Sequence, residues 1–151
     1  MTKQMTLKII FILSIIFLEN NFSQTDKLIH NFRSNTKSES INIIISEIEE
    51  SIKQSDVLKL SQFINAQTYF SLMGNINGYY TTNQAFYILE DFFKINKIQL
   101  FKFNQVNNEE NNPYATGTLY YESKGRKNKA QVFVTLKRVG ESWIISQLSI
   151  N

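Results

Sequence analysis

The sequence predicts an α+β fold in which N-terminal helices pack on a strongly curved, mostly antiparallel sheet, in the order α-α-β-β-α-β-β-β-β. Three observations support this prediction. Apolar residues in the first half recur at helical spacing. The last third, Tyr114 to Ile150, alternates between apolar and polar residues, which is typical of strands. Turn-forming residues such as Gly125 and Gly140 separate the alternating segments.

Residues 1–23 are predicted to be a signal peptide. Lys3 and Lys8 precede an apolar run from Ile9 to Leu18, about half of the roughly 20 apolar residues that a bilayer span needs. Cleavage is expected after Ser23 or Gln24, and the small Ser23 suits a signal peptidase. We therefore expect an exported protein, periplasmic or extracellular, without a membrane span.

Residues 24–39 are polar and are predicted to be a flexible lead-in, and 40–151 to be a single domain. The absence of cysteine excludes disulfides, a lipid anchor on cysteine and cysteine-rich zinc sites. Loss of Lys3, Lys8 and Glu19 with the signal peptide lowers the formal net charge from +3 to +2. So mild a charge gives no reason to expect a nucleic-acid partner.

Three helices are expected. Between residues 41 and 53, one stripe of isoleucines has helical spacing: Ile41, Ile44, Ile45, Ile48 and Ile52. Asp56 can cap a short second helix. Thr81 and Gln84 have the spacing of a capping box, so a third helix should begin there and continue through Ile95.

The strands are predicted from alternation and turn residues. A hairpin pairs Gln67 to Met73 with Tyr79 and Tyr80 around a turn rich in glycine and asparagine. Four more strands follow: Ile98 to Asn107, Ala115 to Ser123, a strand containing Ala130 to Lys137, and Ser142 to Ile150. Strict alternation in the last strand places Ile144, Leu148 and Ile150 on one face and Trp143 and Ile145 on the other.

Several residues carry a resemblance to a known superfamily: Gly78-Tyr79-Tyr80-Thr81 with Gln84-Ala85, Phe92-Phe93, Gly117, Leu119, Leu136-Lys137, and Trp143-Ile144-Ile145 with Gln147. From about Ser40 to Ile150 the chain resembles the nuclear-transport-factor-two-like (cystatin-like cone) superfamily, and more closely a family of small exported bacterial proteins of unknown function. The resemblance implies a cone-shaped sheet that wraps a long N-terminal helix, with a pocket between them. It implies no activity, because these residues bear the fold.

Enzymes of this superfamily are expected to place an aspartate with a histidine or tyrosine inside the cone. The only histidine, His30, lies in the lead-in. Glu90 and Asp91 are the catalytic candidates, but consecutive helical residues point about 100° apart and cannot both face one pocket. A desolvated carboxylate there would have a raised pKa and could act as a general acid or base. The alternative is a pair of solvated surface charges.

Cofactor and metal motifs are missing from the sequence. No cluster of histidine or cysteine and no Asp-x-Asp spacing suggests a metal site. Gly74 and Gly78 fit a hairpin turn and lack the pattern of a phosphate-binding loop. We therefore predict neither a metal nor a cofactor.

The aromatic content is the strongest remaining signal, with 12 Phe, 7 Tyr and 1 Trp. Six of these residues are candidates for binding a small apolar ligand: Tyr69, Phe86, Phe93, Tyr120, Phe133 and Trp143. Such residues either line a cavity or fill the core. A cavity larger than about 300 Å3 would favour ligand binding.

A surface basic patch is predicted in and around one turn: Lys124, Arg126, Lys127 and Lys129. Such a patch suits peripheral contact with an anionic lipid surface or an acidic polymer. It could equally keep the protein soluble and protect the sheet edges.

Three functional hypotheses follow. The first is an exported, non-enzymatic binding or interaction domain that holds a small apolar ligand or a protein partner. The second is an isomerase-type or hydrolase-type enzyme that uses Glu90 or Asp91 with a tyrosine. The third is a structural homodimer that associates through the sheet face carrying Phe133.

Overall fold

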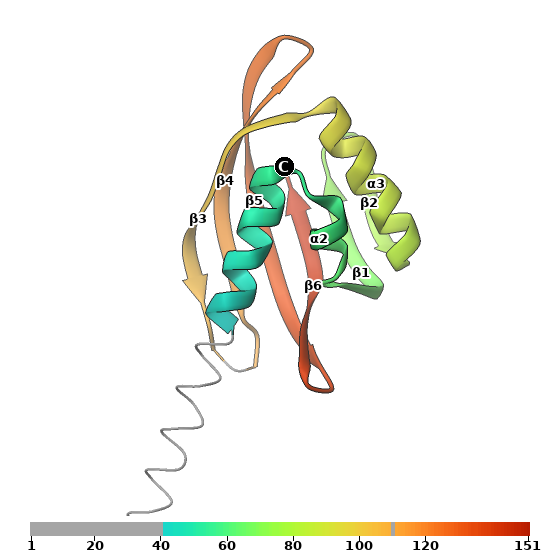
Figure 1. Ribbon diagram of the computed structural model, residues 1–151, viewed down its shortest axis with the longest axis vertical. Helices are drawn as coiled ribbons and strands as arrows, with labels where there is room; N and C mark the ends of the chain where they lie inside the picture. The colour runs from blue at the N-terminus through green and yellow to red at the C-terminus, as the bar shows by residue number, and fades with distance from the viewer. Residues whose placement is uncertain (1–40, 110) are drawn as a thin grey trace, which may run out of the picture. The chain divides into compact units, whose positions relative to one another are not determined.

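The computed structural model describes residues 41–109 and 111–151 (Figure 1). The predicted signal peptide, the lead-in and His30 lie outside these residues. The described elements are a helix over residues 41–54, α2 (Val57–Ser61), β1 (Ile64–Leu72), β2 (Ile76–Tyr80), α3 (Thr82–Ile95), β3 (Lys97–Asn107), β4 (Tyr114–Ser123), β5 (Arg126–Val139) and β6 (Ser142–Ile150). Their order is the predicted one.

The six strands form one curved sheet in the order β2-β1-β6-β5-β4-β3. All neighbours pair antiparallel except β1 and β6, which pair parallel. The helices lie on the concave side of the sheet (Figure 1). The predicted α+β fold with a strongly curved, mostly antiparallel sheet is therefore confirmed.

The helices begin where the sequence predicts. The Asp56 side chain accepts a hydrogen bond from the Lys59 backbone N–H at 2.9 Å and caps α2. The predicted capping box is present at the start of α3, because Thr81 and Gln84 each accept a hydrogen bond from the other's backbone N–H. No helix in the described ranges has the length and apolarity needed to cross a membrane.

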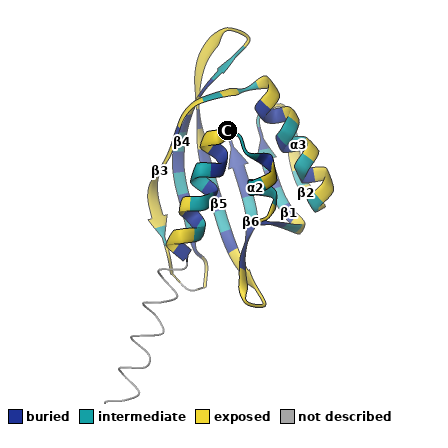
Figure 2. Cartoon of the chain, viewed as in Figure 1, coloured by how far each residue is buried: buried dark blue, intermediate teal, exposed yellow. Residues whose placement is uncertain are grey.

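The core lies between the helices and the concave face of the sheet (Figure 2). Ile41, Ile45, Ile48 and Ile52 on the first helix are at most 4% exposed, as the isoleucine stripe predicts. Leu119 on β4 and Leu148 on β6 are fully buried in the same core. Burial of this apolar surface is what a disulfide-free domain of this size needs for stability.

Two tight turns set the last three strands. Lys124 and Gly125 both have positive φ, 52° and 72°, and join β4 to β5 in a two-residue hairpin. Gly140, with φ 61°, opens the equally short connection between β5 and β6. Both connections lie where the sequence predicts turns.

The predicted faces of β6 are wrong in one respect. The register shifts so that Thr135 pairs with Gln147 and Leu136 with Ile145, which leaves Ser146 as an extra residue in the ladder. Hydrogen bonds hold this bulge, since the Ser146 hydroxyl lies 2.8 Å from the Thr135 hydroxyl and donates to the Thr135 carbonyl. Ile145 therefore joins Leu148 and Ile150 on the concave face, and Ile144 lies on the other.

Candidate functional site

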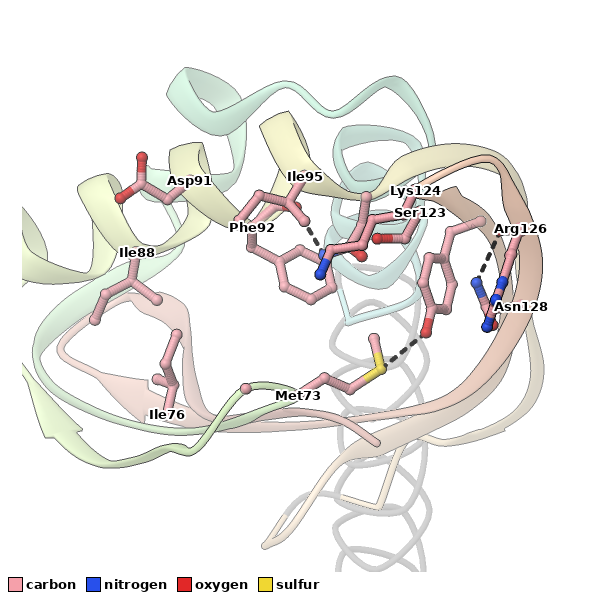
Figure 3. A pocket seen from close by; sticks show the side chains of 13 residues that line it. Met73, Ile76, Ile88, Asp91, Phe92, Ile95, Ser123, Lys124, Arg126 and Asn128 are labelled. Carbon is pink, nitrogen blue, oxygen red and sulfur yellow. Dashed lines mark hydrogen bonds between the residues drawn. The ribbon is translucent and has the colours of Figure 1, made fainter.

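A cavity of about 770 Å3 opens between α3, the turn after β1 and the β4–β5 hairpin (Figure 3). Its lining consists of Met73, Gly74, Ile76, Ile88, Asp91, Phe92, Ile95, Asn96, Tyr121, Ser123, Lys124, Arg126 and Asn128. The volume falls in the range of about 300 to 1,000 Å3 that is typical of small-molecule sites. The cavity is partly open to solvent, since Lys124, Arg126 and Asn128 in its lining are exposed.

One side of the cavity is apolar. Ile88, Phe92 and Ile95 follow one another at i, i+4 and i+7 on α3, so they share a face of the helix. Met73 and Ile76 approach from the β1–β2 side, and Figure 3 shows Ile76 and Ile88 opposite each other. This side offers aliphatic and aromatic carbon to a guest.

Tyr121 supplies a buried hydroxyl at the wall of the cavity. The residue is 8% exposed, and its hydroxyl donates to the Met73 sulfur at 3.1 Å. A thioether is a weak acceptor, so this donor is poorly satisfied compared with a bond to oxygen. An oxygen atom of a guest would be a better partner for it.

The other side of the cavity is polar and carries two cations. Arg126 and Asn128 lie two residues apart on β5 and so point to the same face, and Lys124 precedes them in the turn. The Asn128 side-chain amide donates to the Arg126 carbonyl at 2.8 Å, which fixes part of this wall. Lys124 and Arg126 have no ion-pair partner among residues 41–109 and 111–151.

The predicted basic patch is thus divided between two faces of the hairpin. Lys124 and Arg126 line the cavity. Lys127 pairs with Glu122, and Lys129 with the half-exposed Tyr120, on the opposite face. The alternation of side chains along a strand explains the division, because neighbouring residues point to opposite sides.

The two catalytic candidates also separate. Asp91 lines the cavity and Glu90 does not. Both carboxylates face Lys94, at 3.1 Å for Glu90 and 3.9 Å for Asp91. The Asp91 side chain is 75% exposed and points away from the centre of the cavity (Figure 3), and that of Glu90 is 41% exposed. Neither carboxylate has the apolar surroundings that the acid–base hypothesis requires.

None of the six predicted ligand-binding aromatics lines this cavity. Phe93 and Trp143 are buried in the core, and Phe86 packs against it. Tyr69, Tyr120 and Phe133 lie on the face of the sheet away from the helices. This outer face also carries Tyr79, whose ring centroid lies 5.2 Å from that of Tyr69, and Tyr114, 5.8 Å from Phe133.

Sequence reasoning missed most of the residues that do line the cavity: Met73, Ile76, Ile95, Asn96, Tyr121, Ser123 and Asn128. One signal was available. Ile88 and Phe92 continue to Ile95 at helical spacing beside the core stripe of α3. Within the described chain, no group of three or more histidine, cysteine, aspartate or glutamate residues is placed to hold a metal ion.

Comparison with protein families identifies the family of this chain. Residues 45–151 match the family model described as "Domain of unknown function (DUF4783)". No curated protein matches the chain.

Solved structures show the same fold. A DUF4783 protein from Bacteroides uniformis is similar with a TM-score of 0.64 and 15% identity, covering 70% of this chain and 94% of that one. A DUF4783 protein from Bacteroides ovatus has a TM-score of 0.61 and 20% identity, covering 69% of this chain and 90% of that one. An NTF-2 like protein of unknown function from Shewanella oneidensis has a TM-score of 0.55 and 12% identity, covering 74% of this chain and 96% of that one. The nuclear-transport-factor-two-like fold is confirmed, and the chain belongs to the DUF4783 family.

Proposed function

We propose that this protein is an exported, non-catalytic binding domain that holds a small molecule in the cavity between α3 and the β4–β5 hairpin. The observation that carries the proposal is the cavity itself, about 770 Å3 in volume, with an apolar wall and a buried tyrosine hydroxyl. Ligand sites commonly combine an apolar lining with a few polar groups that orient the guest. Export rests on the charged and apolar pattern of residues 1–23.

The binding proposal is tested with phenylnaphthylamine, a neutral probe whose fluorescence rises in apolar cavities. Ile88→Trp should fill the apolar side and abolish the fluorescence gain, because Ile88 lines the cavity. Tyr87→Trp is the matched control, since Tyr87 is the preceding residue on α3, is 64% exposed and is not part of the lining. If Ile88→Trp unfolds the domain, Ile95→Trp at an exposed lining position replaces it.

Equal fluorescence gain in the parent protein and both variants would contradict binding in this cavity. Loss of the gain in the cavity variant alone, with an unchanged thermal unfolding midpoint, would support it.

A second candidate role is self-association through the outer face. Leu100 and Tyr120 stand directly opposite each other on β3 and β4 and are 54% and 46% exposed. Burial of such a cross-strand apolar pair would stabilise a dimer. Sedimentation equilibrium tests this role: Leu100→Lys should dissociate a dimer of the parent protein, and a monomeric parent protein would remove the basis of this candidate.

A further inference from the structure

The polarity of the cavity changes along its length. In Figure 3, Ile76 and Ile88 lie at one end, and Arg126 and Asn128 at the other, with Met73 and Phe92 between them. The Tyr121 hydroxyl meets Met73 in the middle of this series. A guest that matches the whole cavity must therefore have an apolar end and a polar end.

The charge at the polar end is positive. Lys124 and Arg126 are both cavity-lining cations without an ion-pair partner in the described chain. The one lining carboxylate, Asp91, is at the apolar end in Figure 3 and already faces Lys94 at 3.9 Å. An anionic head thus meets two uncompensated cations, whereas a cationic head meets a carboxylate that has a partner.

Neutral donors lie at the same end and in the middle of the cavity. The Tyr121 hydroxyl is held only by a thioether, and the Asn128 amide has a second N–H beyond the one that it donates to Arg126. Ser123 is a further hydroxyl-bearing residue of the lining. Donors and cations together favour an acceptor-rich head such as a carboxylate or a phosphate ester.

The hairpin backbone fixes the positions from which the Lys124 and Arg126 side chains extend. Ser123 pairs with Arg126 across the end of the hairpin, and Lys124 and Gly125 form the two-residue turn between them. Turns of this kind match the twist of the strands that they join, so the positions of Lys124 and Arg126 relative to β4 and β5 are set before a guest arrives.

We propose that the cavity takes a single-chain anionic amphiphile, with its carboxylate or phosphate-ester head at Lys124, Arg126 and Tyr121 and its alkyl chain between Ile76 and α3. This inference rests on the proposed function and narrows it to one class of ligand. It also assigns a role to Lys124 and Arg126, the part of the predicted basic patch that faces the cavity. Lys127 and Lys129, on the other face, do not share this role.

The experiment measures displacement of phenylnaphthylamine by four probes with chains of ten carbons: decanoate, decyl phosphate, decanol and decyltrimethylammonium. Decanoate or decyl phosphate should bind about tenfold more tightly than decanol, and decyltrimethylammonium more weakly than decanol. The order of the two anions distinguishes a fatty-acid-like head from a phosphate-ester head. The anion preference should shrink as ionic strength rises.

Two double variants test which face of the hairpin causes the preference for anions. Lys124→Asn with Arg126→Gln should lower the affinity for the preferred anion about tenfold and the affinity for decanol by much less. Asparagine is chosen because Lys124 has a positive φ, which asparagine tolerates. Lys127→Gln with Lys129→Gln removes the same charge from the opposite face of the same hairpin and should change neither affinity.

The outcomes distinguish failure of the anionic-amphiphile proposal from failure of the proposed small-molecule binding. Equal binding of anion, alcohol and ammonium overturns the anionic amphiphile and leaves small-molecule binding intact. Equal losses in both double variants overturn the local role of Lys124 and Arg126, because net charge alone then explains the preference. Failure of phenylnaphthylamine and all four probes to bind overturns the proposed function itself.

Discussion

The Glu49 carboxylate accepts a hydrogen bond from the backbone N–H of Phe103 at 2.7 Å, across 54 residues of sequence. Phe103 lies on β3, an edge strand of the sheet, and Glu49 on the helix of residues 41–54. Unpaired N–H groups at a sheet edge are open to pairing with another chain. This bond both ties the helix to the sheet and satisfies one of those groups.

Glu49→Ala should lower the free energy of unfolding by about 1 to 3 kcal/mol, because it leaves the Phe103 N–H without its charged acceptor. Glu50→Ala is the control, since Glu50 bonds only to Lys53 and Gln54 on the surface of the same helix and should cost about 0.5 kcal/mol or less. Urea unfolding measures both. Equal losses in the two variants would contradict the role given to Glu49.

Gly117→Ala should destabilise the pairing of β3 and β4. A Cβ at this position would lie 2.4 Å from the Lys102 carbonyl oxygen and 3.0 Å from the Phe103 Cα, which are backbone atoms that cannot rotate away. We expect a loss of about 1 to 3 kcal/mol in the free energy of unfolding. Thr118→Ala, at the next residue on the strand, should cost less stability. If Gly117→Ala is as stable as the parent protein, the two strands make room for the Cβ and the prediction is wrong.

Thr68→Val should destabilise the junction of β1 with β6. The Thr68 hydroxyl is fully buried, donates to the Ile145 carbonyl at 2.9 Å and accepts from the Asn65 N–H. Valine keeps the shape but removes the donor, which should cost about 1 to 3 kcal/mol. Thr116→Val, at a partly exposed site on the outer face, is the control and should change stability little. Chemical denaturation that finds the two variants equal would refute this role.

Tyr121→Phe should weaken binding of decanoate more than it weakens folding. The hydroxyl bonds only to the Met73 sulfur, a weak acceptor, so its removal should cost less than about 1 kcal/mol of stability. Binding should fall by about three- to tenfold, since a donor to the anionic head is lost. Displacement titration and thermal unfolding give the two numbers. Unchanged affinity would place the head away from Tyr121.

Asp91→Asn tests the enzymatic alternative from the same cavity. Because the carboxylate is 75% exposed and faces Lys94, we expect its amide to leave decanoate affinity unchanged or slightly tighter and stability within about 0.5 kcal/mol. Glu90→Gln on the same helix turn provides the comparison outside the cavity lining. A large loss of affinity in Asp91→Asn alone would return Asp91 to the candidate catalytic residues.

The elements of this fold were predictable because each rests on local chemistry. The isoleucine spacing of residues 41–52, the Thr81 and Gln84 capping box and the turn at Gly140 are visible in the sequence and recur in the structure. The facing of Ile145 was not predictable, because a single extra residue at Ser146 reverses the alternation and depends on the register with β5.

The site was less predictable than the fold. Whether an aromatic lines or fills a cavity depends on how α3 lies over the sheet, which no local pattern records. Trp143 and Tyr120 carry the same aromatic signal, yet one is buried in the core and the other lies on the outer face. The basic turn was visible, but the division of Lys124 and Arg126 from Lys127 and Lys129 follows only from the register of β4 with β5.

The most direct test of the central claim is a crystal structure of the domain with decanoate bound. We predict the alkyl chain between Ile76 and Ile88 and the carboxylate within hydrogen-bonding distance of Arg126 and the Tyr121 hydroxyl. Decanoate on the outer face beside Tyr120, with the cavity closed by Ile88 and Phe92, would contradict the claim.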